Sequence, residues 1–150
     1  MGPLIPEFGQ STAGIRYTLR PGGYGIVRDA AARIAVVATP LGLFLPGGGQ
    51  EQGESPEAAL VREAREESGL DVRVLHPVGI ADELVFSASE RTYFRKRCTF
   101  FTAAAESEAI HRCEPDHQLR WLPVADAITQ LTHESQRWAV RTADKFASKK

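Results

Sequence analysis

The sequence predicts an α+β fold built on a mixed β-sheet, and three observations support this class. Short runs of β-branched and aromatic residues, bounded by polar or glycine-rich segments, are typical of strands. Residues 56–68 instead have apolar positions at helical spacing and a capping residue at each end. Two further helical patterns close the chain, so strands, a helix, strands and helices follow one another. Both an α+β domain and a sandwich around a mixed sheet fit this order.

The composition fits a single globular domain. The chain has 150 residues, of which 43% are hydrophobic and 25% charged. Residues 1–13, which carry Gly, Pro and Ser, are expected to form a flexible N-terminal arm, and residues 14–150 the domain. The formal net charge of -1 does not favour nucleic-acid binding. No apolar run approaches the roughly 18 residues of a membrane span, and no secretory signal is visible, so we expect a cytoplasmic protein.

Three strand-like segments precede the long helical pattern. A Pro-Gly-Gly sequence at 21–23 interrupts residues 15–29, so we expect two short strands around a turn there. Residues 33–39 are a β-branched apolar run, which predicts a buried strand. Residues 41–49 form a second short apolar run that ends in a proline and three glycines.

The helix predicted over residues 56–68 carries its own start and stop signals. Ser55 is a good N-cap, and Pro56 suits the first helical position. Glu57 complements the positive end of the helix dipole. Gly69 favours the left-handed conformation that ends a helix, so the helix should stop just before it.

The remaining elements follow from the same patterns. Two long strands joined by a polar connection come next, and Pro77 is expected to break the first of them. One more short strand and two helical segments complete the chain. The strands are expected at 71–86, 92–105 and 119–123, and the helices at 124–131 and 134–146.

Three glutamates gather on one face of the predicted long helix. Glu63, Glu66 and Glu67 lie within one arc, beside the apolar stripe that must pack on the sheet. Like charges at this spacing repel, at about 0.2–0.5 kcal/mol per pair. One interpretation is a solvated charged helix balanced by Arg62 and Arg65. The other is a site for a hard divalent cation, which prefers carboxylate oxygens, and the glycine-rich loop before the helix favours it.

The segment from Gly48 to Leu70 resembles the Nudix box, G-x5-E-x7-R-E-U-x-E-E-x-G-U, where U is a bulky aliphatic residue. Gly48, Glu54 and the run REAREESGL at 62–70 match every fixed position. Ala64 is the one departure, since it is smaller than the usual residue at U. The resemblance implies a Nudix-type α/β/α sandwich with a mixed sheet.

The resemblance also implies a function. Nudix proteins hydrolyse a pyrophosphate bond in a nucleoside diphosphate linked to a moiety X, with Mg²⁺ or, as a substitute, Mn²⁺. Depending on the identity of X, the substrate is a nucleoside triphosphate, a nucleotide sugar, ADP-ribose or a dinucleoside polyphosphate. The implied partner is therefore a small-molecule nucleotide, and a homodimer is a common assembly in the family. The alternative is a Nudix-fold sensor that binds a nucleotide without cleaving it.

Residue roles follow from the same resemblance. Glu63, Glu66 and Glu67 would bind the metal ion, and Glu63 or else Glu67 would act as the general base. Arg62 would be an orienting partner that pairs with a glutamate such as Glu54. Glu54 would also add to the metal ligands.

Further roles fall on the loop before the helix and on the chain after it. Gly47 and Gly48 would let the loop turn and bring its backbone near the metal and the phosphates. Glu51 and Glu54 would add outer ligation or ligands for a second metal ion. Family members often use another carboxylate beyond the box, and Glu114 is favoured here because its loop precedes a strand and could close over the site. The other candidates are Glu106, Glu108 and Asp116.

Clues to X come from a basic run within an aromatic strand. If the strand alternates, Arg95 and Arg97 share one face and Lys96 points to the other. Arg95 and Arg97 are predicted to bind substrate phosphate, with a solvated sheet face as the alternative. Aromatic residues that could stack on a base, but are expected in the core, are Tyr24, Phe94 and Trp121.

Overall fold

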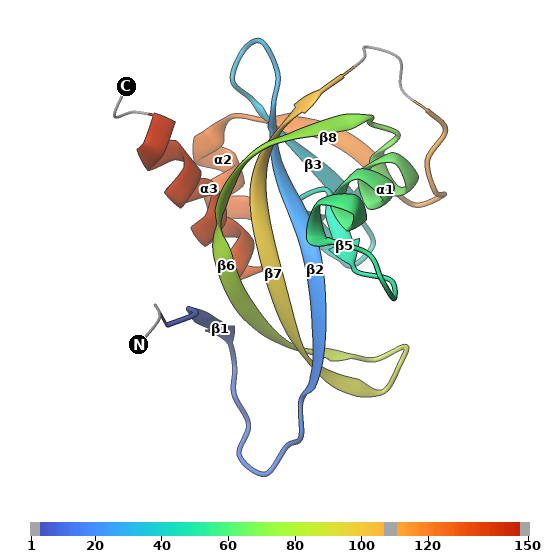
Figure 1. Ribbon diagram of the computed structural model, residues 1–150, viewed down its shortest axis with the longest axis vertical. Coiled ribbons are helices and arrows are strands. Elements are labelled where there is room, and N and C mark those ends of the chain that lie inside the picture. Colours follow the sequence, from blue (N-terminus) through green and yellow to red (C-terminus); the bar gives the residue numbers. More distant parts are fainter. Residues whose placement is uncertain (1–3, 107–110, 148–150) are drawn as a thin grey trace.

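The computed structural model describes residues 4–106 and 111–147, and it has a mixed sheet with helices on both faces (Figure 1). Helix α1 covers one face, and α2 and α3 cover the other. The predicted α+β sandwich is therefore confirmed. None of the helices in these residues has the length and apolar content that a membrane span requires. The strands are β1 (Glu7–Gly9), β2 (Thr18–Arg28), β3 (Ile34–Thr39), β4 (Gly42–Phe44), β5 (Gly47–Gly49), β6 (Val72–Ser87), β7 (Thr92–Ala105) and β8 (Gln118–Leu122), and the helices are α1 (Pro56–Ser68), α2 (Val124–Gln130) and α3 (Glu134–Ala147).

The sheet opens between β2 and β3. The main path is β1-β6-β7-β2-β3-β4, with β5 paired to β2 and β8 paired to β3. β1 runs parallel to β6 and β2 parallel to β7, whereas the other pairs are antiparallel. The register between β2 and β3 consists of the pair Arg28–Ile34 alone. The two strands diverge from that point, and β5 pairs with β2 where they have separated.

Apolar side chains form a core on each side of the sheet. The cluster under α2 and α3 includes Ile26, Val36 and Phe100, all almost fully buried. The cluster under α1 includes Leu60 and the Ala64 methyl, which are both fully buried. Burial of a leucine side chain contributes about 1.5–3 kcal/mol. This packing holds α1 rigidly against the sheet, so the charged face of the helix has a fixed position.

Both ends of α1 have the predicted caps. The Ser55 hydroxyl accepts a hydrogen bond from the Ala58 backbone N–H at 3.1 Å, and Pro56 opens the helix. Gly69 has a φ of 75°, and its N–H donates to the Arg65 carbonyl at 3.0 Å. Because these signals are local in sequence, they define the helix without help from the rest of the fold.

Substitution of the N-cap should destabilise the protein measurably. Ser55→Ala leaves the Ala58 N–H without its side-chain acceptor, and we expect a loss of about 1 kcal/mol in the free energy of unfolding. Denaturant unfolding followed by circular dichroism measures this loss. The control is Ser11→Ala at an exposed position outside any helix, which should leave stability unchanged. Equal losses in the two variants would contradict the capping role.

The prediction of two short strands at 15–29 is wrong, because β2 runs unbroken through Pro21, Gly22 and Gly23. The glycines allow close approach of other backbone and do not form a turn. A Cβ on Gly23 would lie 1.9 Å from the Pro56 carbonyl oxygen at the start of α1, and one on Gly22 would lie 2.6 Å from the Gly48 carbonyl oxygen. Only glycine fits at these two positions, so they bring α1 and β5 against β2.

One other expectation needs correction. Pro77 does not break the strand at 71–86; β6 continues past it with register shifts at Val74/His76 and Pro77/Gly79. The segment predicted as a loose arm contains β1, which pairs with β6. The Phe8 ring on β1 also lies 6.1 Å from that of Trp138 on α3. The division into an arm at 1–13 and a domain at 14–150 stays a prediction.

Candidate active site

The glutamates of α1 lie against the short strand β5. A Cβ on Gly48 would come within 2.8 Å of the Cγ and Cδ atoms of Glu63. Gly47 has a φ of 137°, which side chains rarely tolerate, and a Cβ there would lie 2.2 Å from the Gly23 carbonyl oxygen. Gly48 therefore lets the Glu63 side chain pack directly on the β5 backbone, and Gly47 lets β5 lie close to β2.

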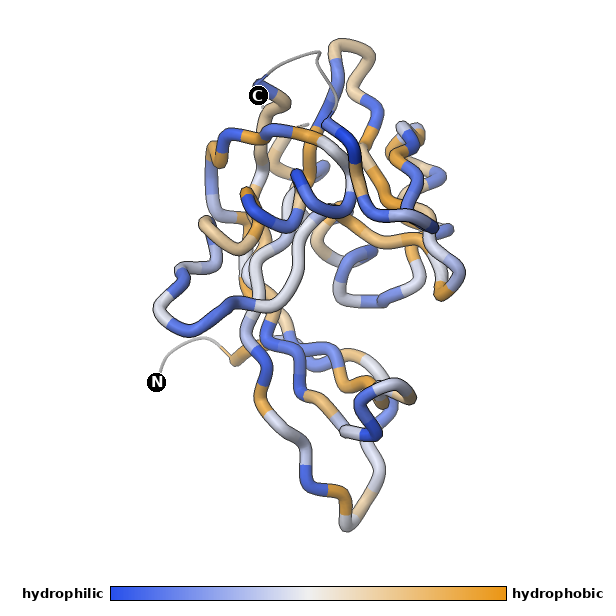
Figure 2. The backbone as a smooth tube through the Cα atoms, turned by 90° about the vertical axis from the view of Figure 1, so that its right-hand side faces the viewer, coloured by the Kyte–Doolittle hydropathy of each residue, from blue (hydrophilic) through white to orange (hydrophobic). Residues whose placement is uncertain are grey.

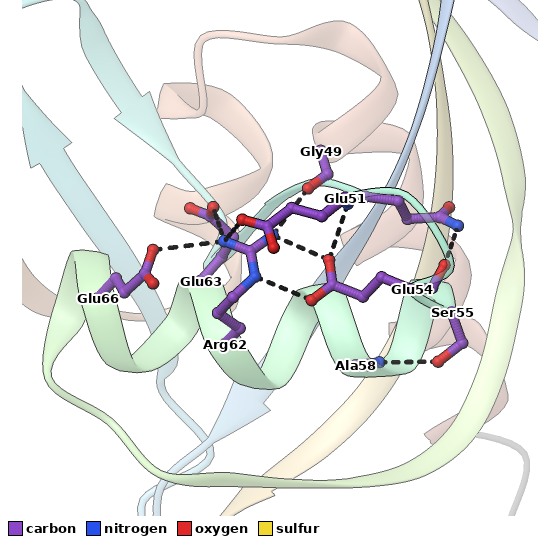
Figure 3. A network of polar contacts seen from close by, with 9 residues as sticks. Gly49, Glu51, Glu54, Ser55, Ala58, Arg62, Glu63 and Glu66 are labelled. Carbon is purple, nitrogen blue, oxygen red and sulfur yellow. Dashed lines mark hydrogen bonds and ion pairs between the residues drawn. The ribbon is translucent and has the colours of Figure 1, made fainter.

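Arg62 lies at the centre of the charged cluster (Figure 3). Its Nε and Nη2 donate to the two carboxylate oxygens of Glu54, each at 2.9 Å. Its Nη2 also donates to the Gly49 carbonyl at 3.0 Å, and its Nη1 to Glu63 Oε1 at 2.5 Å. The Glu66 carboxylate lies 3.4 Å from Nη1. The predicted pairing of Arg62 with Glu54 is present, in the bidentate form that fixes both side chains.

These bonds change the ionisation of the pair. Hydrogen bonds from Arg62 lower the pKa of Glu54 to about 2. The same bonds raise the pKa of the Arg62 guanidinium above its usual range. Both groups are therefore charged at neutral pH. Glu51 adds a weaker contact, with its carboxylate 3.7 Å from Arg62 Nη1.

Glu67 has a different environment from the other glutamates of the box. Its side chain is 22% exposed, and Oε1 is buried without a hydrogen-bond partner in the described part of the chain. Burial raises its pKa to about 8, and the neighbouring carboxylates of Glu63 and Glu114 add to this effect. A buried carboxylate oxygen without a partner is costly. Glu67 is thus the carboxylate in the cluster that still lacks a partner and can bind a cation.

The loop before β8 brings Glu114 to the same place. The backbone N–H of Glu114 donates to the Glu66 carbonyl at 3.0 Å, near the end of α1. His117 follows, and its Nε2 lies 3.8 Å from Glu67 and 3.6 Å from Glu114. The sequence indicated Glu114 but not His117, because no spacing relates His117 to the box. Of the other candidates, the Glu106 N–H donates to the Asp71 carbonyl instead, Asp116 lines a surface hollow together with His117, and Glu108 lies outside the described residues.

The oxygens of this cluster fit a divalent cation. Within residues 4–106 and 111–147, no three His, Cys, Asp or Glu side chains already converge on one point as a formed metal site. The unpaired Oε1 of Glu67 nevertheless lacks a positive partner, and the Glu63 carboxylate is close enough to raise the Glu67 pKa. Carboxylate oxygens alone suit Mg²⁺ or Mn²⁺ better than a softer metal.

The two arginines predicted to bind phosphate have other partners. Arg97 donates to both carboxylate oxygens of Asp82, at 2.9 and 3.0 Å. Arg95 donates to Asp82 at 3.1 Å and to Glu7 at 2.6 Å. The structure thus places Arg95 and Arg97 around a buried aspartate and not beside the glutamates of α1. The aromatic residues Tyr24 and Phe94 are buried, as expected for core packing.

Comparisons with known proteins agree with this geometry. The family model described as NUDIX domain matches residues 20–142. A solved NUDIX hydrolase from Nitrosomonas europaea is similar in structure, with a TM-score of 0.63 and 16% identity, over 87% of this chain and 90% of that one. No curated protein matches the chain in sequence.

Two more solved structures share the fold. The MutT protein from Methanosarcina mazei Go1 has a TM-score of 0.66 and 15% identity, over 89% of this chain and 99% of that one. The E. coli ORF135 protein has a TM-score of 0.66 and 19% identity, over 89% of this chain and 94% of that one. The family model spans most of the chain and includes the whole glutamate cluster, so the predicted Nudix pyrophosphohydrolase is confirmed, and the chain belongs to the NUDIX domain family.

Proposed function

We propose that the protein is a Mg²⁺-dependent hydrolase that cleaves a pyrophosphate bond in a nucleoside diphosphate linked to X. The observation that carries this proposal is the buried Glu67 carboxylate with an unpaired oxygen, beside Glu63 and within a complete box. A pyrophosphate is anionic and repels an attacking hydroxide. A bound Mg²⁺ supplies charge neutralisation and a more acidic water.

Different residues of the chain have different roles in this proposal. Glu63, Glu66 and Glu67 would hold the metal ion, and Glu54 and Glu114 are further candidate ligands. Arg62 positions Glu63 and Glu54 by the bonds described above. Gly48 leaves room for the Glu63 side chain next to the β5 backbone, and Gly47 lets β5 approach β2 closely.

The general base is better placed on Glu67 than on Glu63. Glu63 Oε1 already accepts a hydrogen bond from the Arg62 guanidinium, which makes it a poorer proton acceptor. Glu67 Oε1 has no hydrogen-bond partner among the described residues, so it is free to accept a proton. We therefore assign the proton of the attacking water to the Glu67 carboxylate and not to that of Glu63.

A product assay tests the proposal. Purified protein is incubated with nucleoside triphosphates, nucleotide sugars, ADP-ribose and dinucleoside polyphosphates, with Mg²⁺ or with chelator, and the products are separated by chromatography. We expect cleavage of one substrate class that stops with chelator. Folded protein that binds a nucleotide tightly but cleaves none of the panel would instead favour the non-catalytic sensor. The cytoplasmic location and a homodimer stay predictions from the sequence.

Metal binding should also stabilise the fold. A cation that neutralises Glu67 and its neighbours binds the folded chain only, and saturation to 100 times its Kd adds about 2.7 kcal/mol. We expect Mg²⁺ to raise the melting temperature, and chelator to reverse the rise. The double variant Glu63→Gln/Glu67→Gln should lose this response. An equal rise in that variant would place the cation elsewhere.

A further inference from the structure

Arg20 and Lys96 lie side by side on neighbouring strands. They face each other in the parallel register of β2 and β7. Alternate residues of a strand share a face, so both lie on the face that carries Tyr24 and Phe100. The ring contact between Tyr24 and Phe100, with centroids 5.8 Å apart, supports this assignment. Arg95 is on the opposite face, as the sequence predicted for the two neighbours of Lys96.

Arg20 extends from this cationic pair to the candidate active site. Arg20 Nε lies 3.1 Å from the position that a Cβ on Gly49 would take, so the side chain passes over β5. The carbonyl of the same Gly49 accepts a hydrogen bond from Arg62 at 3.0 Å. Tyr24 is close both to the glutamates of α1 and to Arg20. Its pKa is raised by burial and by the Glu67 and Glu63 carboxylates, and is lowered by Arg20.

Lys96 has no fixed anionic partner. Lys96 is half-buried, and its ammonium group makes no hydrogen bond or ion pair with any residue in 4–106 or 111–147. Glu83 faces it across the β6–β7 register, but the Glu83 carboxylate is buried and accepts from the Ser135 N–H at 2.8 Å. A half-buried ammonium without a partner can bind an anion at little structural cost.

Arg20 has a partner that an incoming anion can replace. Its Nη1 lies 2.8 Å from the Glu90 carboxylate, and the two side chains are 44% and 50% exposed. Exposed ion pairs of this kind contribute little to stability. Glu90 lies in the connection between β6 and β7, where these strands project beyond the helices (Figure 1). Hydrophilic and hydrophobic residues follow one another along this projecting part of the molecule (Figure 2). By contrast, Asp82, the shared partner of Arg95 and Arg97, is only 3% exposed.

We propose that Arg20 and Lys96 bind a phosphate of X, so that the substrate is a nucleoside polyphosphate and not a nucleotide linked to a neutral sugar. This inference rests on the proposed function, because it extends the same site along β2 and β7. Arg20 presents a planar fork of donors and Lys96 a compact charge, and both bind phosphate oxygens well. The two cations replace Arg95 and Arg97 as the phosphate-binding residues.

Matched substrate pairs test the proposal. Each pair shares its nucleoside diphosphate and differs only in X: ATP and ADP-ribose, GTP and GDP-mannose, and UTP and UDP-glucose. We expect wild-type kcat/KM to be higher for the triphosphate of the preferred pair. Lys96→Met should lower kcat/KM for that triphosphate about 10- to 100-fold and for the sugar member less than about 2-fold. Lys96→Arg should restore most of the activity, because it restores the charge.

Control variants separate this role from a general loss of charge. Arg97→Gln removes a cation from the opposite face of β7 and should not change the ratio between the two substrates, with folding checked by circular dichroism. Lys96→Met breaks no hydrogen bond or ion pair among the described residues, so it should fold like the wild type. An equal effect of Lys96→Met on both members of a pair, or a wild-type preference for the sugar member, overturns the proposal.

A binding measurement separates this inference from the proposed function. Inorganic tripolyphosphate is titrated calorimetrically in the presence of chelator, so that neither metal nor turnover contributes. We expect wild type to bind at least about 10-fold more tightly than Lys96→Met. Equal binding overturns the anion site even if nucleotides are cleaved. Lys96-dependent binding without cleavage of any nucleotide would retain the anion site and refute the hydrolase.

Discussion

Glu67→Gln is expected to lower kcat by about 100- to 1,000-fold while the protein stays folded. The amide has the same shape as the carboxylate, but it can neither accept the proton of the attacking water nor balance the charge of a metal ion. Glu67 Oε1 is buried without a partner among the described residues, so the carboxylate is free for this role. Steady-state kinetics with the best substrate of the panel measures the change.

The matched control is Glu57→Gln in the first turn of the same helix. Glu57 is exposed, so its loss should change kcat by less than about 2-fold. A folded Glu67→Gln protein with wild-type kcat would remove Glu67 from the reaction, and the base would then return to Glu63.

The same substitution should change how stability depends on pH. The Glu67 pKa rises from 4.5 to about 8 on folding, so between these values the folded chain holds a proton that the unfolded chain has lost. In metal-free protein, Glu67 therefore favours folding less as pH rises from about 4.5 to about 8. Melting temperatures in chelator should fall across this window relative to those of Glu67→Gln. Parallel curves for the two proteins would show that Glu67 ionises normally.

The sequence predicted α1 and its glutamates well because their determinants are local. Ser55 and Gly69 define the ends of the helix by bonds to backbone groups within a few residues. The box then fixes the helical face on which Glu63 and Glu67 lie. The Arg62–Glu54 pair was also predictable, since it joins residues eight positions apart in a single loop and helix.

Features that depend on distant segments could not be predicted in this way. Gly22 and Gly23 indicate a turn when read alone, and only the approach of Pro56 shows that they allow close packing. His117 reaches Glu67 through a loop that no pattern connects to the box. The alternation of side chains between the two faces of the strand at residues 95–97 was predicted correctly. Which of these two faces turns to the active site depends on the pairing of β7 with β2.

Arg62→Met is expected to lower both stability and activity. It removes the bidentate bonds to Glu54, the bond to Glu63 and the bond to the Gly49 carbonyl, and it leaves those acceptors without their donor. Glu54 and Glu63 then repel each other next to the β5 backbone. We expect the melting temperature to fall by about 5 °C and kcat/KM to fall about 10- to 100-fold, because Glu63 loses its fixed position.

The pH dependence distinguishes lost ion pairing from lost packing. The Glu54 pKa is lowered from 4.5 to about 2 on folding, so its contribution is present above pH 4.5 and is lost as pH falls toward 2. The difference in melting temperature between wild type and Arg62→Met should therefore narrow across this range. Arg65→Met is the control on the same helix: its side chain is 59% exposed and its nearest carboxylate oxygen, on Asp71, is 3.8 Å away. A difference that stays constant down to pH 2 would mean that Arg62 supports the site by packing alone and does not orient the glutamates by charge.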